Sequence, residues 1–82
     1  MYELTLSSKA KKQLSNLPQQ IQDRIGASFE RIKIRPYYFV KRKQGTPYFI
    51  LRMGEYRAIL DIKGDKLLIL VIEIGHRKKI YK

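Results

Sequence analysis

Residues 48–74 read YFILRMGEYRAILDIKGDKLLILVIEI, which is three apolar segments separated by two glycine-containing dipeptides. The apolar segments span residues 48–53, 56–62 and 67–74. Gly54-Glu55 and Gly64-Asp65 are tight-turn signals, and short apolar segments joined in this way form antiparallel strands. The last segment is apolar on both faces, as in a strand inside a sheet. The sequence therefore predicts a three-stranded antiparallel sheet in this half.

The other half of the chain begins with an alternating segment, residues 2–6, which predicts a short strand. A serine cap at Ser7 or Ser8 opens a first helix, and Pro18 separates it from a second helix that stops at Arg35. Apolar residues recur on one face of each helix, at Ala10, Leu14 and Leu17 and at Ile21, Ile25, Phe29 and Ile32. Because the link is short, we expect an antiparallel helical hairpin.

This order predicts an α+β fold: one strand, a two-helix hairpin, and then a three-stranded antiparallel sheet with the helices packed on one face. Residues 35–47 are basic and aromatic and are interpreted as a connection. The 82 residues are enough for one domain, placed at 1–82. A domain of this size buries only roughly 60% of its unfolded surface, so its core is marginal.

Charge is the dominant feature of the composition, because 18 Lys and Arg against 7 Asp and Glu give a net charge of +11. This balance favours RNA, DNA, an acidic protein or an anionic membrane as partner, with a merely solvated surface as the alternative. The absence of cysteine excludes disulfides and thiolate metal sites. With one histidine and scattered carboxylates, no metal or cofactor is expected. No apolar run approaches the about 20 residues of a membrane span, and no signal peptide is recognised, so a cytoplasmic protein is expected.

The Gly54-Glu55 turn places two arginines face to face. In a two-residue hairpin loop, Arg52 stands opposite Arg57, where like charges repel. Glu73, Asp61 or an incoming phosphate could compensate for this repulsion. Two guanidiniums fixed on a strand pair form a pre-organised anion site. An ordinary exposed arginine pair is the alternative.

Two further basic segments border this pair. After the last strand, which Gly75 is expected to end, His76, Arg77 and Tyr81 combine the groups needed to cleave RNA through its 2′-hydroxyl without a metal. A bystander histidine in a frayed tail is the alternative. The second basic segment is residues 41–43, and the aromatic residues Tyr37, Tyr38 and Phe39 precede it. Aromatic side chains beside cations suit single-stranded RNA, although at least one of the three is expected to pack in or near the core. The residues predicted to bind RNA are Lys41, Arg42, Lys43, Arg52, Lys78 and Lys79.

Residues 51–82, LRMGEYRAIL-DI-KGDK-LLILVIEIGHRKKIYK, resemble the RelE/ParE superfamily of toxins from toxin–antitoxin pairs. The strongest matches are R-x-G-E-Y-R-x-I at residues 52–59 and I-G-H-R-x-x-x-Y at residues 74–81. The resemblance implies a type II toxin of the RelE branch, a metal-independent endoribonuclease that cuts mRNA in the ribosomal A site. It implies catalytic roles for Arg57, Arg77 and Tyr81, with His76 at a position that is often basic. The implied partners are the ribosome, mRNA and an acidic RelB-like antitoxin, with the toxin monomeric or in a heterotetramer.

One position departs from the pattern of the ribosome-cutting members. Those members commonly carry Lys or Arg two residues before Arg52, where this sequence has Ile50. The missing proton acceptor could be replaced by His76, by Tyr81, or by a loop lysine such as Lys41 or Lys43. A ParE-like gyrase poison and a weakly active or inactive RNA-binding member remain the alternative functions.

Overall fold

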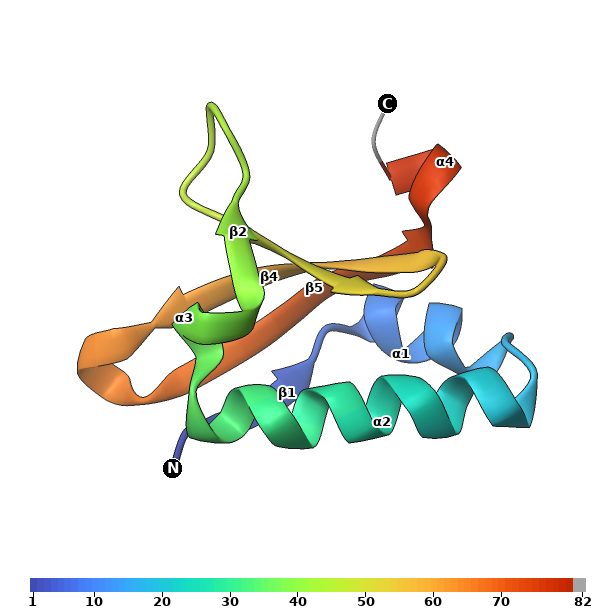
Figure 1. The fold of residues 1–82 in the computed structure, drawn as a ribbon, viewed down its shortest axis with the longest axis horizontal. Helices are drawn as coiled ribbons and strands as arrows, with labels where there is room; N and C mark the ends of the chain where they lie inside the picture. The colour runs from blue at the N-terminus through green and yellow to red at the C-terminus, as the bar shows by residue number, and fades with distance from the viewer. Residues whose placement is uncertain (81–82) are drawn as a thin grey trace.

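The structure is a computed structural model that describes residues 1–80 and the side chains of residues 1–78. Its centre is a five-stranded sheet with the order β1-β5-β4-β3-β2 (Figure 1). The strands are β1 (Glu3–Leu6), β2 (Val40–Arg42), β3 (Phe49–Met53), β4 (Tyr56–Lys63) and β5 (Leu68–His76). β1 runs parallel to β5, and the other neighbours are antiparallel, so the sheet is mixed.

Two longer helices follow β1, as the periodicity predicts. They are α1 (Ser8–Ser15) and α2 (Gln19–Ile34). Ser7 caps α1, because its Oγ accepts a hydrogen bond of 3.0 Å from the amide of Ala10. Pro18 precedes α2 and Arg35 ends it, which confirms both predicted limits. None of the helices in residues 1–80 is long and apolar enough to cross a membrane.

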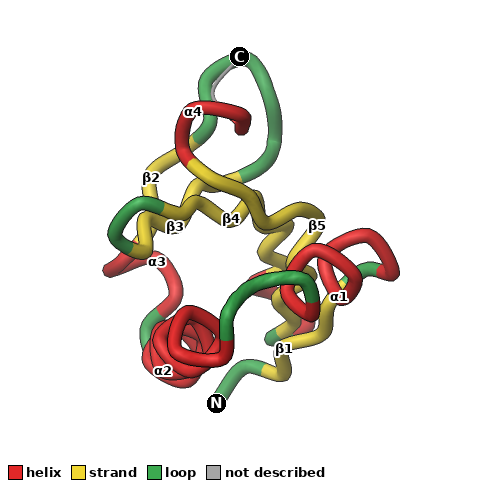
Figure 2. The backbone as a smooth tube through the Cα atoms, turned by 90° about the vertical axis from the view of Figure 1, so that its right-hand side faces the viewer, coloured by secondary structure: helices red, strands yellow, loops and turns green. Residues whose placement is uncertain are grey.

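The core lies between the helices and one face of the sheet (Figures 1 and 2). Its buried residues from the helices are Ala10, Ile25, Phe29 and Ile32. Its buried residues from the strands are Leu51, Ala58, Leu60, Ile62, Ile69, Val71 and Ile74. The α+β class and the placement of the helices on one face are thus confirmed.

The sheet is larger than the sequence predicts. Residues 35–47 are not only a connection, because they contain the short helix α3 (Pro36–Phe39) and the edge strand β2. β2 is a three-residue strand, too short to show an alternating pattern. Its basic side chains suit an exposed sheet edge, where charge discourages unwanted pairing. Strand β1 forms the opposite edge of the sheet, where it pairs with β5.

Both predicted turns are confirmed, and they differ in length. Gly54-Glu55 is the expected two-residue loop, with Met53 paired to Tyr56. Gly64-Asp65 also lies in a turn between two strands, as predicted, but this turn is longer: residues 64–66 form a 3₁₀ turn, and Leu67, at φ 54°, is its left-handed residue. A Cβ at position 64 would lie 3.0 Å from the Tyr37 hydroxyl, at the far end of an exposed side chain that would have to shift slightly.

The end of β5 also differs from the prediction. Gly75 does not break the strand but pairs with Arg57 inside the ladder, and β5 continues to His76. The short helix α4 (Arg77–Ile80) then follows without a linker. The backbone hydrogen bonds to β4 explain why the strand tolerates its glycine. The basic residues after the strand therefore begin from a fixed position.

Candidate functional site

The sheet face opposite α1 and α2 carries a hollow lined by cations. Arg52 pairs with Arg57, as predicted, and Ile50 pairs with Lys41 of β2. Because side chains alternate along a strand, these residues share one face. They surround a hollow of about 280 Å³, which Phe39 also lines. In Figures 1 and 2 the β2–β3 connection and α4 rise on this side of the sheet, whereas α2 lies on the other.

Arg57 is the anchored member of this group. Its side chain lines the hollow, yet the residue is only 7% exposed. Its Nη1 donates hydrogen bonds of 3.2 Å to the Gly54 carbonyl and 3.4 Å to the Tyr56 carbonyl. Across the ladder it faces Gly75, which has no side chain to compete for space. The guanidinium is therefore fixed by the backbone of the turn, and Arg57 is not the surface residue that the sequence suggests.

The two carboxylates considered as partners of the arginine pair are engaged with lysines. Glu73 lies opposite Ile59, and its Oε1 is 3.4 Å from Lys9 Nζ. Asp61 Oδ2 is 3.5 Å from Lys63 Nζ. In the described part of the chain, no ion pair joins either carboxylate to Arg52. Lys41, Arg52 and Arg57 bring cationic side chains to the hollow, which suits an anion.

Glu55 connects the turn to the C-terminal segment, a role that the sequence reasoning missed. Its carbonyl accepts a hydrogen bond of 2.9 Å from the amide of Arg77. Its Oε2 lies 3.4 Å from His76 Nε2 and 4.0 Å from Arg77 Nε. The available signal was a single acidic residue inside the basic R-x-G-E-Y-R motif.

His76 does not join the arginine hollow. It pairs with Tyr56, and the two rings meet edge-on with centroids 5.7 Å apart. Because Tyr56 and Arg57 are consecutive in β4, their side chains lie on opposite faces. His76 and Tyr56 instead line a separate hollow of about 330 Å³ with Gln13 and Leu17. The structure thus separates His76 from Arg57 by the thickness of the sheet.

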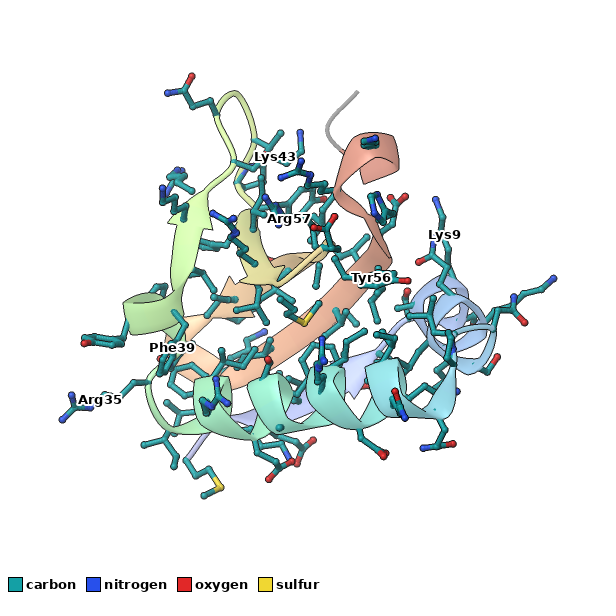
Figure 3. The ribbon with its side chains drawn as sticks, turned by 45° about the vertical axis from the view of Figure 1, so that its right-hand side comes forward. Lys9, Arg35, Phe39, Lys43, Tyr56 and Arg57 are labelled. Atoms are coloured by element: carbon teal, nitrogen blue, oxygen red, sulfur yellow. The ribbon has the colours of Figure 1, made fainter. Side chains whose placement is uncertain are left out.

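The predicted basic segment 41–43 is divided between the two sides of the sheet. Lys41 lines the arginine hollow, whereas Arg42 points to the other side and places its Cζ 5.8 Å from the centre of the Phe49 ring. Lys43 extends the ladder, with its amide donating to the Tyr48 carbonyl at 2.9 Å. Figure 3 shows Lys43 and Arg57 on the same side of the sheet, away from α2.

The aromatic residues of α3 are all exposed. Tyr37 packs edge-on against Phe49 at the margin of the core, with centroids 5.5 Å apart. Tyr38 is 74% exposed and contacts only the edge of the Phe39 ring among the ring pairs described. Phe39 borders both the arginine hollow and a smaller hollow beside α2 that Ile32 and Leu51 also line.

The remaining predicted residues lie at the end of the chain. Arg77 and Lys78 are exposed in α4. The side chain of Lys79 and the whole of Tyr81 lie outside the described residues. Among the residues that are described, no group of three or more His, Asp or Glu side chains could hold a metal ion.

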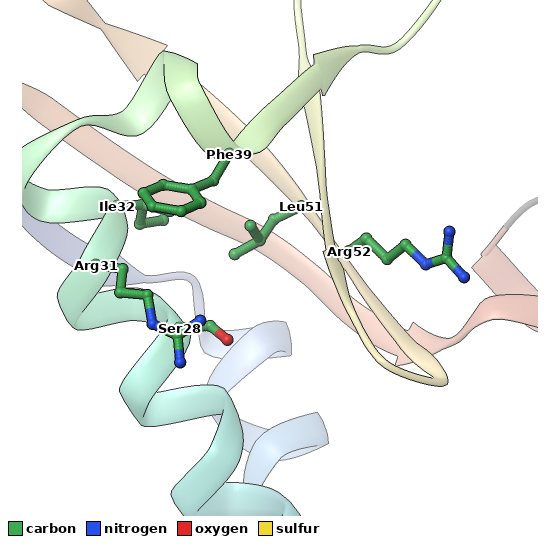
Figure 4. A pocket seen from close by; sticks show the side chains of 6 residues that line it. All are labelled: Ser28, Arg31, Ile32, Phe39, Leu51 and Arg52. Atoms are coloured by element: carbon green, nitrogen blue, oxygen red, sulfur yellow. The ribbon is translucent and has the colours of Figure 1, made fainter.

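A second basic hollow lies between α2 and β3. It measures about 290 Å³ and is lined by Arg24, Ala27, Ser28, Arg31, Arg52, Met53 and Gly54. A smaller hollow of about 60 Å³ adjoins it beside Phe39. Figure 4 shows Ile32, Leu51 and Phe39 gathered between α2 and the sheet, whereas Arg52 points away from them. The sequence reasoning did not foresee that arginines of α2 border the same strand as Arg52.

Comparison with known proteins agrees with the motifs and the fold. A family model described as the ParE toxin of the type II toxin–antitoxin system parDE matches residues 4–81. The chain belongs to this ParE toxin family. It is therefore a toxin of a type II toxin–antitoxin system, which confirms the resemblance to the RelE/ParE superfamily. The search of curated proteins found no match to this ParE-family chain.

Solved toxin structures share the fold of this ParE-family chain. The RelBE2 toxin–antitoxin complex of Mycobacterium tuberculosis matches with a TM-score of 0.83 and 23% identity over 93% of this chain and 98% of that chain. The isolated Escherichia coli RelE toxin matches with a TM-score of 0.81 and 17% identity, over 99% of this chain and 92% of that chain. The YoeB/ParE toxin of Agrobacterium tumefaciens matches with a TM-score of 0.76 and 15% identity, over 92% of this chain and 98% of that chain. At these identities the likeness establishes the fold alone.

Proposed function

We propose that this toxin is a ribosome-dependent mRNA endoribonuclease that cuts in the A site and arrests translation without a metal ion or cofactor. The observation that carries the proposal is the hollow on the open sheet face, where Lys41, Arg52 and Arg57 converge. Arginine presents a planar set of donors that matches phosphate oxygens, and Arg57 is held in place before any ligand arrives. Pre-organised donors of this kind stabilise charge that develops in a transition state.

The reaction consists of one bond exchange at phosphorus. The ribose 2′-oxygen attacks the adjacent phosphorus, the bond to the 5′-oxygen breaks, and the products are a 2′,3′-cyclic phosphate and a 5′-hydroxyl. Arg57 stabilises the negative charge on the phosphate oxygens, with Arg52 beside it. One group must accept the 2′ proton, and another must protonate the leaving 5′-oxygen.

Lys41 is our candidate for one of these proton transfers. It lies directly across the ladder from Ile50, the position where the resemblance leads one to expect a basic residue. Cβ atoms of such cross-strand pairs are about 4.5–5.5 Å apart. A lysine at position 41 can therefore place its ammonium in the space that a lysine at position 50 would reach. Tyr81, outside the described residues, and Arg77 of α4 remain the C-terminal candidates from the sequence.

The open geometry of the hollow explains why the proposal includes the ribosome. Nothing in the described chain closes over the sheet face to hold an RNA strand in line for attack. Correct orientation of the reacting groups is worth about 7–11 kcal/mol when it is fully achieved. A ribosome-bound mRNA is already ordered, so the toxin needs to add only the charged groups. This function places the toxin in the cytoplasm.

Mapping of RNA ends after induction of the toxin tests the proposal. Cuts at A-site codons support it. A DNA-damage response without such cuts would instead support a gyrase poison, the alternative that the ParE family match favours. If neither A-site cuts nor a DNA-damage response is observed, the remaining alternative is a simple RNA-binding protein.

The expected partner in the resting cell is an acidic RelB-like antitoxin. Structures that share this fold include toxin–antitoxin complexes, such as RelBE2 of Mycobacterium tuberculosis. A segment with carboxylates would complement the arginines of the open face and of the α2–β3 hollow. It would inhibit the toxin by covering Arg57 or Arg77, or by displacing Tyr81. Raising the salt concentration should then slow association much more than it speeds dissociation.

A further inference from the structure

The β3–β4 turn touches both arginines to which the resemblance gives catalytic roles. The carbonyl of Gly54 accepts from Arg57 Nη1 at 3.2 Å. The carbonyl of the next residue, Glu55, accepts from the amide of Arg77 at 2.9 Å. Arg57 lies in β4, whereas Arg77 opens α4 after the end of β5. Two consecutive carbonyls therefore connect segments that are distant in the sequence.

The side chain of Glu55 adds a second connection to the same segment. Its Oε2 is 3.4 Å from His76 Nε2 and 4.0 Å from Arg77 Nε. His76 Nδ1 accepts a hydrogen bond of 3.3 Å from the amide of Lys78. In a neutral imidazole one nitrogen accepts and the other donates, so Nε2 carries the hydrogen that faces Glu55. The carboxylate thus faces a donor on each of two consecutive residues.

Gly54 allows this turn to form. Its φ of +65° lies in the left-handed region, and a Cβ added there would meet no atom within 4 Å. An alanine at position 54 would therefore strain the backbone without a steric clash. Gly45, in the β2–β3 connection, has a φ of +77° and is equally free of neighbours. The chain thus provides a matched control for backbone strain.

We propose that the Gly54-Glu55 turn is the positioning element of the site, and that Glu55 is a positioning residue that acts through Arg77. The proposal rests on the function proposed above, in which these arginines act on the phosphate. Glu55 carries a negative charge close to a site for an anion, so it weakens the attraction for RNA. Its contribution is the fixed position of Arg77 relative to Arg57, and small displacements of such groups lower reaction rates strongly.

The first arm of the test uses NMR on the free protein and needs no RNA. We expect Glu55→Gln to lower the hydrogen-exchange protection of the Arg77 amide by about two- to five-fold, because exposed ion pairs contribute little each. The Arg77 Nε–H signal should also move. Glu73→Gln, which removes a carboxylate paired with Lys9, is the control and should change neither signal. Unchanged protection in Glu55→Gln, or an equal change in Glu73→Gln, would overturn the proposal.

The second arm separates positioning from general damage to the fold. In single-turnover cleavage on programmed ribosomes, Glu55→Gln should lower the maximal rate by about ten-fold while affinity stays equal or increases, because a repelling charge is lost. Gly54→Ala should lower the rate more than Gly45→Ala does. A parallel loss of rate and affinity, or equal effects of the two alanines, would contradict the positioning role. If the wild-type toxin cuts no RNA, the proposed function fails, and the NMR arm still decides whether the turn holds Arg77.

Discussion

Strands β3 and β4 have two faces, and the residues buried on each face have different roles. On the face toward the helices, Leu51, Ala58 and Leu60 are 3%, 0% and 0% exposed and pack into the core. On the other face, the same strands carry Ile50, Arg52 and Arg57 around a hollow. Arg57 is nearly as buried as the core residues, but its Nη1 donates to the carbonyl oxygens of Gly54 and Tyr56. Burial on one face thus supplies stability, and on the other it fixes a charged group.

This difference implies that neighbouring residues of one strand should have separable effects. A period of two assigns consecutive positions to opposite faces. Substitutions on the core face should lower the free energy of unfolding and lower activity only through unfolding. Substitutions on the open face should lower activity at nearly constant stability, with Arg57 as the exception because it is buried.

The largest loss of stability is expected for Leu60→Ala. Leu60 is fully buried, and truncation of such a leucine costs about 2–5 kcal/mol through lost transfer energy and a residual cavity. In a small domain with a marginal core this change should unfold a large fraction of the protein. Ile59→Ala, one residue earlier and on the open face, should cost clearly less. Urea titration followed by circular dichroism measures both, and equal losses would contradict the assignment of faces.

Arg57→Ala should cause the largest loss of activity. Loss of a pre-organised charge contact lowers a rate by about 10²–10³-fold. It should also destabilise the fold by about 1–3 kcal/mol, because two hydrogen bonds from a buried guanidinium disappear. Arg77→Ala, at an exposed position, should lower the rate while stability changes by less than about 0.5 kcal/mol. Cleavage assays and urea titrations of the two variants, side by side, check this contrast.

Some of these features could be predicted from the sequence because they depend on residues that are close together in the chain. The opposition of Arg52 and Arg57 follows from the two-residue turn alone, since loop length fixes register in a hairpin. The limits of α1 and α2 follow from Ser7, Pro18 and the 3.6-residue periodicity. Each of these signals involves residues that are close together in the chain.

Other features depend on contacts between distant segments and could not be predicted. Arg57 is buried where it pairs with Gly75 of the distant strand β5, and the role of Glu55 depends on Arg77 returning to the turn. The separation of His76 from Arg57 depends on the register of β5 against β4. β2 was missed because pairing with β3, rather than its own three residues, makes it a strand.

A smaller effect on activity is expected in β2, where consecutive residues again face opposite sides. Lys41→Ala should lower cleavage by about 10²-fold, at the lower end of the range of general acid–base contributions. Arg42→Ala, whose side chain lies over Phe49, should cleave at nearly the wild-type rate. Because Lys41 and Ile50 are cross-strand partners, Ile50→Lys should restore activity to the Lys41→Ala variant. Absence of rescue would show that another group transfers the proton.

The smallest expected effect is on stability at high pH, and it involves Tyr37. Desolvation, together with the Tyr2 hydroxyl and the Asp65 carboxylate, raises the pKa of Tyr37 above its ordinary value of 10.0. Below that value the side chain is neutral in both the folded and the unfolded chain. Above it the unfolded chain loses the proton first, so the folded state loses stability as the pH rises. Urea titrations between pH 9 and 11 should show a shallower loss for Tyr37→Phe, and identical pH profiles would contradict this.

The central claim is that the arginines of the open face act on RNA phosphate. The most direct measurement is single-turnover cleavage of mRNA on programmed ribosomes, with product ends identified for wild type, Arg57→Ala and the control Arg42→Ala. The account predicts A-site cuts that leave 2′,3′-cyclic phosphate and 5′-hydroxyl ends, slower by about 10²–10³-fold for folded Arg57→Ala and unchanged for Arg42→Ala. Products with 5′-phosphate ends, or cleavage by Arg57→Ala at the wild-type rate, would contradict it.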